Sequence, residues 1–424
     1  MNGTPRVSVI MPSYNHAPFV GKAIDSVLGQ SFQDFELIIA DDGSTDGSVE
    51  VIRGFDDPRI DLNVFPENHG ACKALNDCVT RARGEYVAVL NSDDFFLPGK
   101  LARQVAYLDG APEVGAVFGL ARFVDERGAV IGPGDGVPTP YFSTAPADRF
   151  GWLREFFLRG NALCHPSVMI RRRLYDELGL YDGSLRQVPD LDMWIRVCAR
   201  YPIVVLAEEL ICFRILDGFR NTSAPSPAVR RRGEWEMTRV LRRFWSIDEA
   251  VLATALADEI PAEFAARPWP MAVKLAMVPS GGSPSFLQLY ALNTMERAVT
   301  GGQAGIGPKD MHRVSGALDP FRMTALEERD RDLEACRAEL AALGRATDGS
   351  RQGLEECRAV LAASRRRADD LEAEVALLRG SNSWRLTAPL RAVVGAIRGQ
   401  GRDRGRNRAR DRGRRQGRDP SAGS

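Results

Sequence analysis

The cysteines of this sequence are neither paired nor spaced as disulfide frameworks and zinc sites require. The 424 residues contain seven cysteines, an odd number, and no Cys-x-x-Cys motif occurs among them. This pattern argues against a disulfide framework and against a structural zinc site. We therefore expect reduced, mostly buried thiols at Cys72, Cys78, Cys164, Cys198, Cys212, Cys336 and Cys357.

Long hydrophobic runs are also missing from the sequence. No segment approaches the roughly 18 consecutive apolar residues that a membrane-spanning helix requires. The first apolar run covers only residues 7–11 and is followed directly by Pro12, so it does not resemble a signal peptide. We expect a cytoplasmic protein and leave open a peripheral contact with the inner face of the membrane.

The chain has no net charge, because 56 Lys and Arg balance 56 Asp and Glu. No overall field therefore selects nucleic acid or a membrane as a partner. Residues 398–424 are an exception, with ten Arg and three Asp. Composition predicts a disordered, Arg-rich tail over residues 401–424, which could contact RNA or anionic lipid. No aromatic residue is interleaved with the arginines, so nucleic acid is an unfavoured partner.

The first 110 residues alternate short apolar runs with amphipathic stretches at intervals of about 25 residues. This alternation predicts an α/β fold with a Rossmann-like, mostly parallel sheet flanked by helices. The expected strands cover residues 7–11, 35–40, 60–65 and 86–90, with helices that include 18–30 and 70–83. Further along we expect strands at 114–125 and 203–215, helices at 151–160, 171–179 and 189–202, and a long loop at 128–146.

The rest of the chain is predicted to be helical. Residues 224–310 form a helical region with a linker at its end, and residues 311–380 place apolar side chains at heptad spacing, as a coiled coil does. The segment 333–342 recurs at 354–363, an offset of three heptads. We expect this coil to join copies of the chain, with a solvated single helix as the alternative. Residues 381–400 are a short amphipathic segment, either an interfacial membrane anchor or a helix packed on the coil.

Polar residues follow each of the first four predicted strands. In parallel α/β sheets, ligands bind beyond the carboxyl ends of the strands, so these residues would meet at one rim. Taken singly, each segment is compatible with an ordinary turn or helix cap. Their occurrence after four consecutive strands favours a binding site. The segments are residues 12–15, 41–46, 67–70 and 91–94.

Asp93 and Asp94 are adjacent carboxylates directly after the fourth strand. A divalent cation would offset their repulsion, and Mg²⁺ is typically held by one or two carboxylates together with the oxygens of a diphosphate. The implied ligand is a nucleotide diphosphate compound, with Tyr14 stacking on the base and Asp42 accepting hydrogen bonds from base or ribose. Neither GxxxxGK[ST] nor GxGxxG follows a strand, which argues against ATPase-type and dinucleotide-binding folds.

Four ordered segments resemble the successive blocks of the glycosyltransferase family 2 catalytic domain, which has the GT-A fold. They are VSVIMPSYN (7–15), FELIIADDGSTDGS (35–48), ENHGACKALNDCVTRARGEYVAVLNSDD (67–94) and VPDLDMWIRV (188–197). The similarity covers about residues 6–223, and we assign residues 1–223 to a GT-A domain. It implies transfer of a sugar from a nucleotide-diphosphate sugar to a hydroxyl acceptor, with inversion at the anomeric carbon.

The resemblance also implies roles for individual residues. Asp190 matches the general base, which would take the proton of the attacking hydroxyl. Asp94 would bind the divalent metal, Mg²⁺ or Mn²⁺, that neutralises the departing diphosphate. From the residues alone, Asp190 and Asp192 could each be a cap or a favourable charge at a helix start, and we expect Asp192 to be structural. The matching nucleotide-sugar-binding positions are Pro12, Tyr14, Asn15, Asp42, Lys73, Asp93 and His165.

Two positions depart from the family pattern. Leu216 stands where relatives often carry a His ligand, and Pro189 stands where a Glu often precedes the base. Both favour an alternative, a catalytically weak scaffold that recruits partners through its coiled coil. A nucleotidyltransferase would need a basic, Gly-rich segment after the first strand, which residues 11–20 lack. We expect a role in surface polysaccharide or glycan assembly, and a glycan, a lipid-linked or a protein acceptor is left open.

Overall fold

The computed structural model describes most of the N-terminal three quarters of the chain. Two compact units were found, one of Met1–Pro279 with Leu289–Ile306 and the other of Ser280–Gln288 with Gly307–Ser424. Most of the expected coiled coil, the amphipathic segment 381–400, the tail 401–424 and much of the expected loop 128–146 lie outside the described residues. The described residues are 3–132, 142, 146, 148–216, 227–320, 331–335, 338, 366, 367 and 370.

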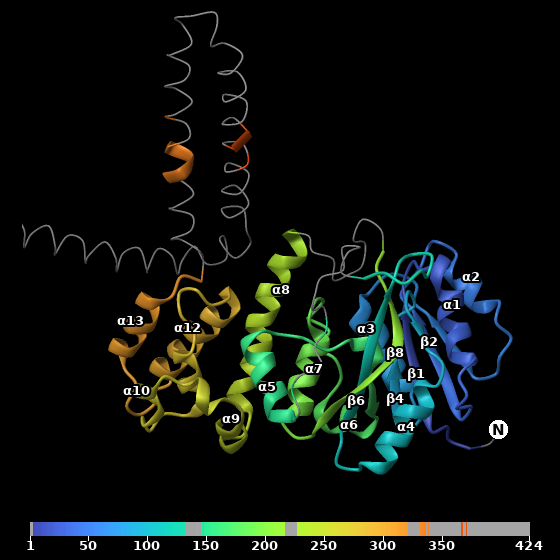
Figure 1. The fold of residues 1–424 in the computed structure, drawn as a ribbon, viewed down its shortest axis with the longest axis horizontal. Helices are drawn as coiled ribbons and strands as arrows, with labels where there is room; N and C mark the ends of the chain where they lie inside the picture. The colour runs from blue at the N-terminus through green and yellow to red at the C-terminus, as the bar shows by residue number, and fades with distance from the viewer. Residues whose placement is uncertain are drawn as a thin grey trace, which may run out of the picture. The chain divides into compact units, whose positions relative to one another are not determined.

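A mixed sheet forms the centre of the first unit (Figure 1). Its eight strands have the order β3-β2-β1-β4-β7-β6-β8-β5. Its first half is parallel, because β1 pairs in parallel with β2 and β4, and β2 with β3. All four of these strands lie where the sequence predicts them. Their bounds are Val7–Ser13 (β1), Phe35–Asp41 (β2), Ile60–Val64 (β3) and Tyr86–Val89 (β4).

The second half of the sheet contains antiparallel pairs. Strand β7 (Met169–Arg171) lies between β4 and β6 (Ala116–Val124), antiparallel to both. Strand β8 (Ile203–Arg214) runs parallel to β6, and the two-residue β5 (Phe95–Phe96) pairs antiparallel with its end. Because β5 begins directly after Asp94, this pairing brings the end of β8 beside the acidic pair.

Helices flank this sheet (Figure 1). The burial of α1 follows the helical period. In α1 the buried residues are Val20, Ala23, Ile24 and Val27, the spacing of one apolar face. The predicted fold class, a mostly parallel sheet flanked by helices, is confirmed. The helices are α1 (Ala17–Leu28), α2 (Ser48–Arg53), α3 (Ala71–Arg81), α4 (Lys100–Gly110), α5 (Arg149–Leu158), α6 (Arg173–Leu178) and α7 (Pro189–Cys198).

Further helices follow the sheet, in agreement with the helical region of the predicted fold class. Within the first unit, α5 packs against α9, and Phe157 of α5 contacts the rings of Phe244 and Tyr290. The first unit therefore continues well past residue 223. The elements are α8 (Pro227–Val240), the 3₁₀ helix η4 (Leu241–Ser246), α9 (Glu249–Leu256), α10 (Ala262–Ala265), α11 (Met271–Lys274) and α12 (Ser285–Thr300).

In the second unit, the described part includes α13 (Pro308–Ala317). The Asp310 carboxylate accepts the Gly307 backbone N–H at 2.9 Å and closes the first turn of this helix. The side-chain amide of Gln288 donates to the carbonyl oxygen of Ser283 at 2.6 Å, and its oxygen accepts the backbone N–H of Asp319 at 2.6 Å. Gln288 thus joins the two stretches of chain that make up this unit.

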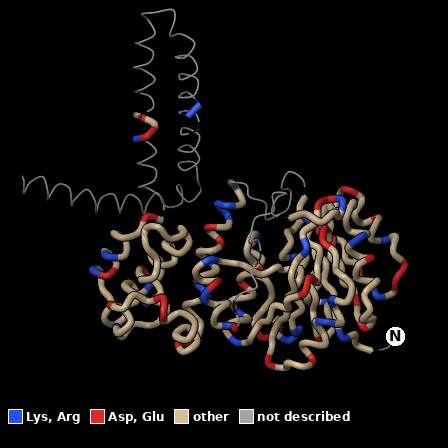
Figure 2. Tube along the Cα trace, in the orientation of Figure 1, with Lys and Arg blue, Asp and Glu red and all other residues tan. Residues whose placement is uncertain are grey.

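Acidic and basic side chains are interspersed along the described chain (Figure 2). Within that part of the chain, no helix is both long and apolar enough to cross a bilayer. The described cysteines, Cys72, Cys78, Cys164, Cys198 and Cys212, are free and buried, as predicted. Cys336 and Cys357 lie outside the described residues.

Candidate functional site

The loop after β2 is tied to the start of α3 by one carboxylate. Asp42 accepts the backbone N–H groups of His69 at 2.7 Å and Gly70 at 2.8 Å, and only 2% of the residue is exposed. Gly43 has a φ of 73°, and a Cβ there would lie 2.6 Å from the backbone of Glu67. Only glycine fits this close approach. Asp42 therefore joins two segments of the predicted rim.

The loop after β1 presents an exposed aromatic ring on the same rim. Tyr14 is 43% exposed, which leaves a ring face open to a ligand. Next to it, Asn15 has a φ of 51°, and its side-chain oxygen accepts the backbone N–H of Thr45 at 2.9 Å. Its own backbone N–H donates to the Ser44 hydroxyl at 2.8 Å, so the loops after β1 and β2 support each other. Of the other predicted residues here, Pro12 is half-buried and Lys73 is exposed in the first turn of α3.

The adjacent carboxylates Asp93 and Asp94 have different surroundings. Asp94 is 2% exposed, and its two oxygens accept the backbone N–H of Arg214 at 2.8 Å and the side-chain amide of Asn91 at 3.0 Å. Burial, together with the like charge of Asp93, raises the pKa of Asp94 well above its usual value. The Asp93 side chain keeps 11% of its surface, and its carboxylate lies 4.0 Å from Nε2 of His16. Asp93 is thus the more accessible carboxylate of the two.

Arg214, at the end of β8, holds the turn that contains Asp93 and Asp94. The sequence did not identify it as a site residue. Its guanidinium donates to the carbonyl oxygen of Asp93 at 2.8 Å and to those of Asp125 and Glu126 at 2.9 and 2.6 Å. The guanidinium also lies 4.8 Å from the ring centre of Phe19. A single Arg within the otherwise apolar run 210–216 was the available signal.

The donor atoms of this turn suit a hard divalent cation shared with a ligand. Two carboxylates provide oxygens, and the pKa of Asp94 is raised by burial and then by the like charge of Asp93, both of which a cation would offset. Leu216, at the position where the family often has His, is buried. Among the described residues, no cluster of three or more His, Cys, Asp or Glu could hold a metal ion. Water and the oxygens of a diphosphate would supply the remaining ligands of such a cation.

Asp190 lies at the start of α7 and is half-buried. One of its oxygens accepts the backbone N–H of Leu191 at 2.9 Å, and the other accepts the side-chain amide of Asn161 at 2.5 Å. Desolvation raises its pKa to about 6, although both hydrogen bonds oppose the shift. A carboxylate with a pKa near neutrality is well suited to take a proton. Asn161 is a second site residue that the sequence did not identify, because it lies in a loop 29 residues away.

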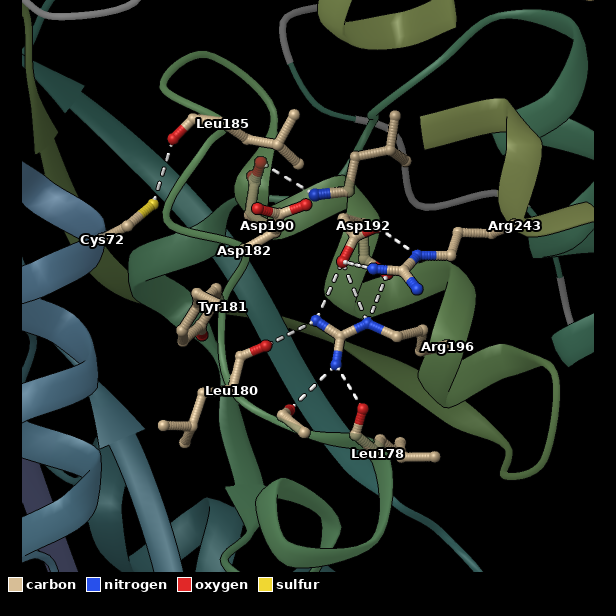
Figure 3. A network of polar contacts seen from close by, with 12 residues as sticks. Cys72, Leu178, Leu180, Tyr181, Asp182, Leu185, Asp190, Asp192, Arg196 and Arg243 are labelled. Atoms are coloured by element: carbon tan, nitrogen blue, oxygen red, sulfur yellow. Dashed lines mark hydrogen bonds and ion pairs between the residues drawn. The ribbon is translucent and has the colours of Figure 1, made fainter. Parts of the chain in front are cut away.

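Asp192, one of the two aspartates in this helix start, is buried in ion pairs. Its carboxylate lies 2.9 Å from the guanidinium of Arg196 and 2.7 Å from that of Arg243, and the side chain is 2% exposed (Figure 3). Both of its oxygens are occupied by arginines on α7 and η4. This environment agrees with the structural role expected for Asp192.

His165 is packed among aromatic side chains. Its Nε2 lies 3.0 Å from the hydroxyl of Tyr181, and its ring contacts those of Tyr181 and Trp194. Burial lowers the pKa of His165 to about 4, so the ring is neutral at physiological pH. The structure thus gives His165 a packing role, and its binding role stays a prediction.

The acidic pair and Asp190 belong to one region of the molecule. Cys164 lies close enough to Asp94 for that charge to raise its pKa further, after burial. The next residue, His165, contacts Tyr181, and the pKa of Tyr181 is raised by burial and, in part, by the charge of Asp190. This series of neighbours puts the two carboxylate centres in the same part of the molecule.

Comparisons with known proteins show which family the chain resembles. Residues 8–178 match the family described as Glycosyl transferase family 2. The chain is 30% identical over 216 residues to the uncharacterized glycosyltransferase MJ1057 of Methanocaldococcus jannaschii, covering 50% of this chain and 71% of that protein. It is 33% identical over 260 residues to the putative glycosyltransferase EpsE of Bacillus subtilis, covering 59% and 82%. It is 37% identical over 196 residues to the putative teichuronic acid biosynthesis glycosyltransferase TuaG of Bacillus subtilis, covering 46% and 72%.

Two solved structures are similar to the chain, with lower sequence identity than these relatives. One is S. aureus TarS 1-349 in complex with UDP, with 16% identity, 69% of this chain and 82% of that chain covered, and a TM-score of 0.45. The other is the mannosyltransferase PcManGT from Pyrobaculum calidifontis in complex with GDP-Man and Mn²⁺. It has 18% identity, 90% of this chain and 88% of that chain covered, and a TM-score of 0.45.

Proposed function

The chain belongs to glycosyltransferase family 2, and we propose that it is an inverting, metal-dependent hexosyltransferase with Asp190 as its general base. The donor is a nucleotide-diphosphate sugar, and the acceptor is a hydroxyl group in surface polysaccharide or glycan assembly. The environment of Asp190 supports this proposal most directly. A half-buried carboxylate with a pKa of about 6 lies in the same region as the Asp93 and Asp94 pair.

Asp190 would act on the acceptor hydroxyl. Its carboxylate takes the proton as the hydroxyl oxygen attacks the anomeric carbon, and the diphosphate leaves from the opposite face with the bonding electrons. A single displacement of this kind inverts the anomeric centre. The amide of Asn161 and the backbone N–H of Leu191 orient the carboxylate, so that it meets the substrate in one fixed position.

The rim after β1 and β2 would hold the nucleotide. The exposed ring of Tyr14 provides a stacking surface, and the oxygens of Asp42 keep lone pairs for a base or ribose beyond the two backbone N–H groups they accept. The exposed ammonium of Lys73 would meet the negative charge of the donor. Pro12, Asn15, Asp93 and His165 complete the proposed donor site.

Asp94 is the carboxylate that we propose for the divalent cation, Mg²⁺ or Mn²⁺, with Asp93 beside it facing the sugar or ribose. When bound, this cation would offset the charge that develops on the departing diphosphate. Asp93 is the alternative ligand, because its carboxylate is the more accessible. Arg214 keeps the turn in place through the carbonyl oxygen of Asp93 and the carboxylate of Asp94.

A screen of nucleotide-diphosphate sugars, followed by release of the nucleoside diphosphate, tests the proposal. With a productive donor and acceptor, Asp190→Asn should lower kcat by about 10²- to 10⁴-fold, the usual contribution of a positioned base. The matched control is Asp248→Asn, which changes another aspartate at a helix start, where it caps α9 by accepting the backbone N–H groups of Ala250 and Val251. A parent-like rate in Asp190→Asn would show that the base is another group.

The catalytically weak scaffold remains the alternative function, and the buried Leu216 favours it because this residue cannot bind a metal or a phosphate. Titration of nucleotide sugars with and without Mn²⁺ separates the two functions. The enzyme should bind its donor more tightly when Mn²⁺ is present. A scaffold without a working donor site should show no metal-dependent binding.

A further inference from the structure

The loop that leads into Asp190 is anchored by side chains from other elements (Figure 3). We call residues 178–188 the base loop, because they connect the end of α6 to α7. Its first part is held by Arg196 of α7, whose guanidinium donates to three successive carbonyl oxygens at residues 178–180, at 2.7, 2.9 and 2.9 Å. Rigid attachment of this kind fixes the direction from which the chain enters α7.

The middle of the base loop is attached to α3. Asn76 donates its side-chain amide to the carbonyl oxygen of Tyr181 at 2.8 Å and accepts the backbone N–H of the same residue at 3.0 Å. The thiol of Cys72, one turn earlier on α3, lies 3.3 Å from the carbonyl oxygen of Leu185. These anchors come from within the part of the chain that matches the family.

The last part of the base loop is held by Glu236 of α8. Its carboxylate accepts three successive backbone N–H groups, from Arg186 at 3.0 Å, Gln187 at 2.6 Å and Val188 at 3.2 Å. The residue is 1% exposed, so its charge is compensated by these donors instead of by water. Val188 directly precedes α7, and a carboxylate at the start of a helix is favourable for its dipole. Asp190 follows only two residues later.

Two arginines extend this attachment along the same face of α8 and η4. Arg239 donates to the hydroxyl of Ser184 at 2.8 Å, and Arg243 donates to the carboxylate of Asp192 at 2.7 Å. They follow Glu236 by three and seven residues, the spacing of one helical face. This face of α8 and η4 therefore carries the carboxylate of Glu236, which binds the end of the base loop. It also carries two arginines, which donate to residues before and after Asp190.

We propose that Glu236 is a positioning residue for Asp190, and that the segment 227–246 is part of the catalytic centre. This inference rests on the proposed function, in which Asp190 is the general base. The family match ends at residue 178, and the sequence placed the end of the catalytic domain at residue 223. Glu236 acts by keeping the last three residues before α7 in one conformation, so that Asp190 meets the acceptor hydroxyl at a constant distance.

Glu236→Gln tests this role. The glutamine keeps the shape of the side chain and one acceptor oxygen, but it removes the negative charge. It also places an NH₂ group against the backbone N–H of Arg186, where the second carboxylate oxygen accepts at 3.0 Å. We expect kcat to fall by about 10- to 100-fold while the KM for the donor stays within about twofold of the parent value. Glu236→Asp, which keeps the charge but retracts the carboxylate, should give a smaller fall and serves if the glutamine variant does not fold.

Asp248→Asn is the matched control. Asp248 also accepts backbone N–H groups at a helix start, those of Ala250 at 2.9 Å and Val251 at 3.3 Å, but it caps α9 outside the base loop. Its kcat should equal that of the parent. An equal fall of kcat in Asp248→Asn and Glu236→Gln would overturn the inference, since a general loss of stability would then explain both.

A double variant separates positioning from other roles. If Glu236 acts through Asp190, Asp190→Asn with Glu236→Gln should turn over at the rate of Asp190→Asn alone, within about twofold. Additive losses would overturn the inference. It is also overturned if Asp190→Asn loses activity while Glu236→Gln keeps the parent kcat. A parent that turns over no donor, or an Asp190→Asn variant as active as the parent, rejects the proposed function itself, and the inference falls with it.

Discussion

Asp94 and Asp190, the carboxylates of the two acidic centres, differ in how far the fold removes them from water. Asp94 is 2% exposed, and burial with the charge of Asp93 raises its pKa well above the usual value. Asp190 is half-buried, and desolvation raises its pKa to about 6. Asp190 can therefore ionise near neutral pH without a bound cation, whereas Asp94 would need a cation to stabilise its ionised form. The same residue type acquires two chemical characters from its surroundings.

Three further effects test this comparison, and the largest of them concerns the metal, on the side of Asp94. Asp94→Asn removes the charge that a cation would offset, so we expect kcat at saturating Mn²⁺ to fall by about 100-fold and the metal concentration for half-maximal rate to rise. Initial rates across a Mn²⁺ titration measure both. Asp93→Asn is the control, with its more accessible carboxylate. If that variant alone loses metal dependence, Asp93 is the ligand and Asp94 only supports the turn.

A second, smaller effect concerns pH and sharpens the comparison on the side of Asp190. The base must be deprotonated to act, and its pKa is about 6, so kcat should rise about tenfold between about pH 5 and about pH 7. The ordinary value of 3.8 would place this limb about two units lower. The pH dependence of kcat at saturating metal and donor measures it. The residual kcat of Asp190→Asn should not show this rise with pH. A rise centred near pH 4 in the parent would contradict a desolvated base.

The smallest expected effect concerns stability. Because the pKa of Asp190 is raised on folding, its charge costs stability that appears as the pH rises from about 4 to about 6 and persists above. Asp190→Asn should therefore be as stable as the parent at about pH 4 and more stable at about pH 7, by up to about 1 kcal/mol after allowance for solvent screening. Urea unfolding at both pH values measures the difference. Destabilisation at pH 7 would mean that the carboxylate is needed for folding.

Much of the fold could be predicted, because its signals are local. Strands β1 to β4 and helices α1 and α3 follow from periodicities of two and 3.6 residues within short windows. The place of β7 between β4 and β6, and the pairing of β5 with the end of β8, could not be predicted in the same way. These pairings join segments that are far apart in the sequence, and no local pattern specifies their register.

The candidate site was predictable to a similar degree. Asp42, Asp93, Asp94 and Asp190 could be proposed from the sequence, because each follows a strand or begins a helix within a recognisable block. Arg214, Asn161 and Glu236 were missed, because their importance lies in bonds to backbone and carboxylate atoms between 29 and 121 residues away. Side chains of this kind carry no motif of their own.

The sequence by itself determined that this protein has a mostly parallel sheet, polar segments at the carboxyl rim of that sheet and four candidate carboxylates. It could do so because backbone periodicity and the order of residues along the chain are local properties. Only the tertiary structure decided that Asp94 is buried, that the pKa of Asp190 is raised to about 6 and that α8 anchors the loop before Asp190. Desolvation and hydrogen bonding depend on which distant segments pack around a group, and that is settled when the chain folds.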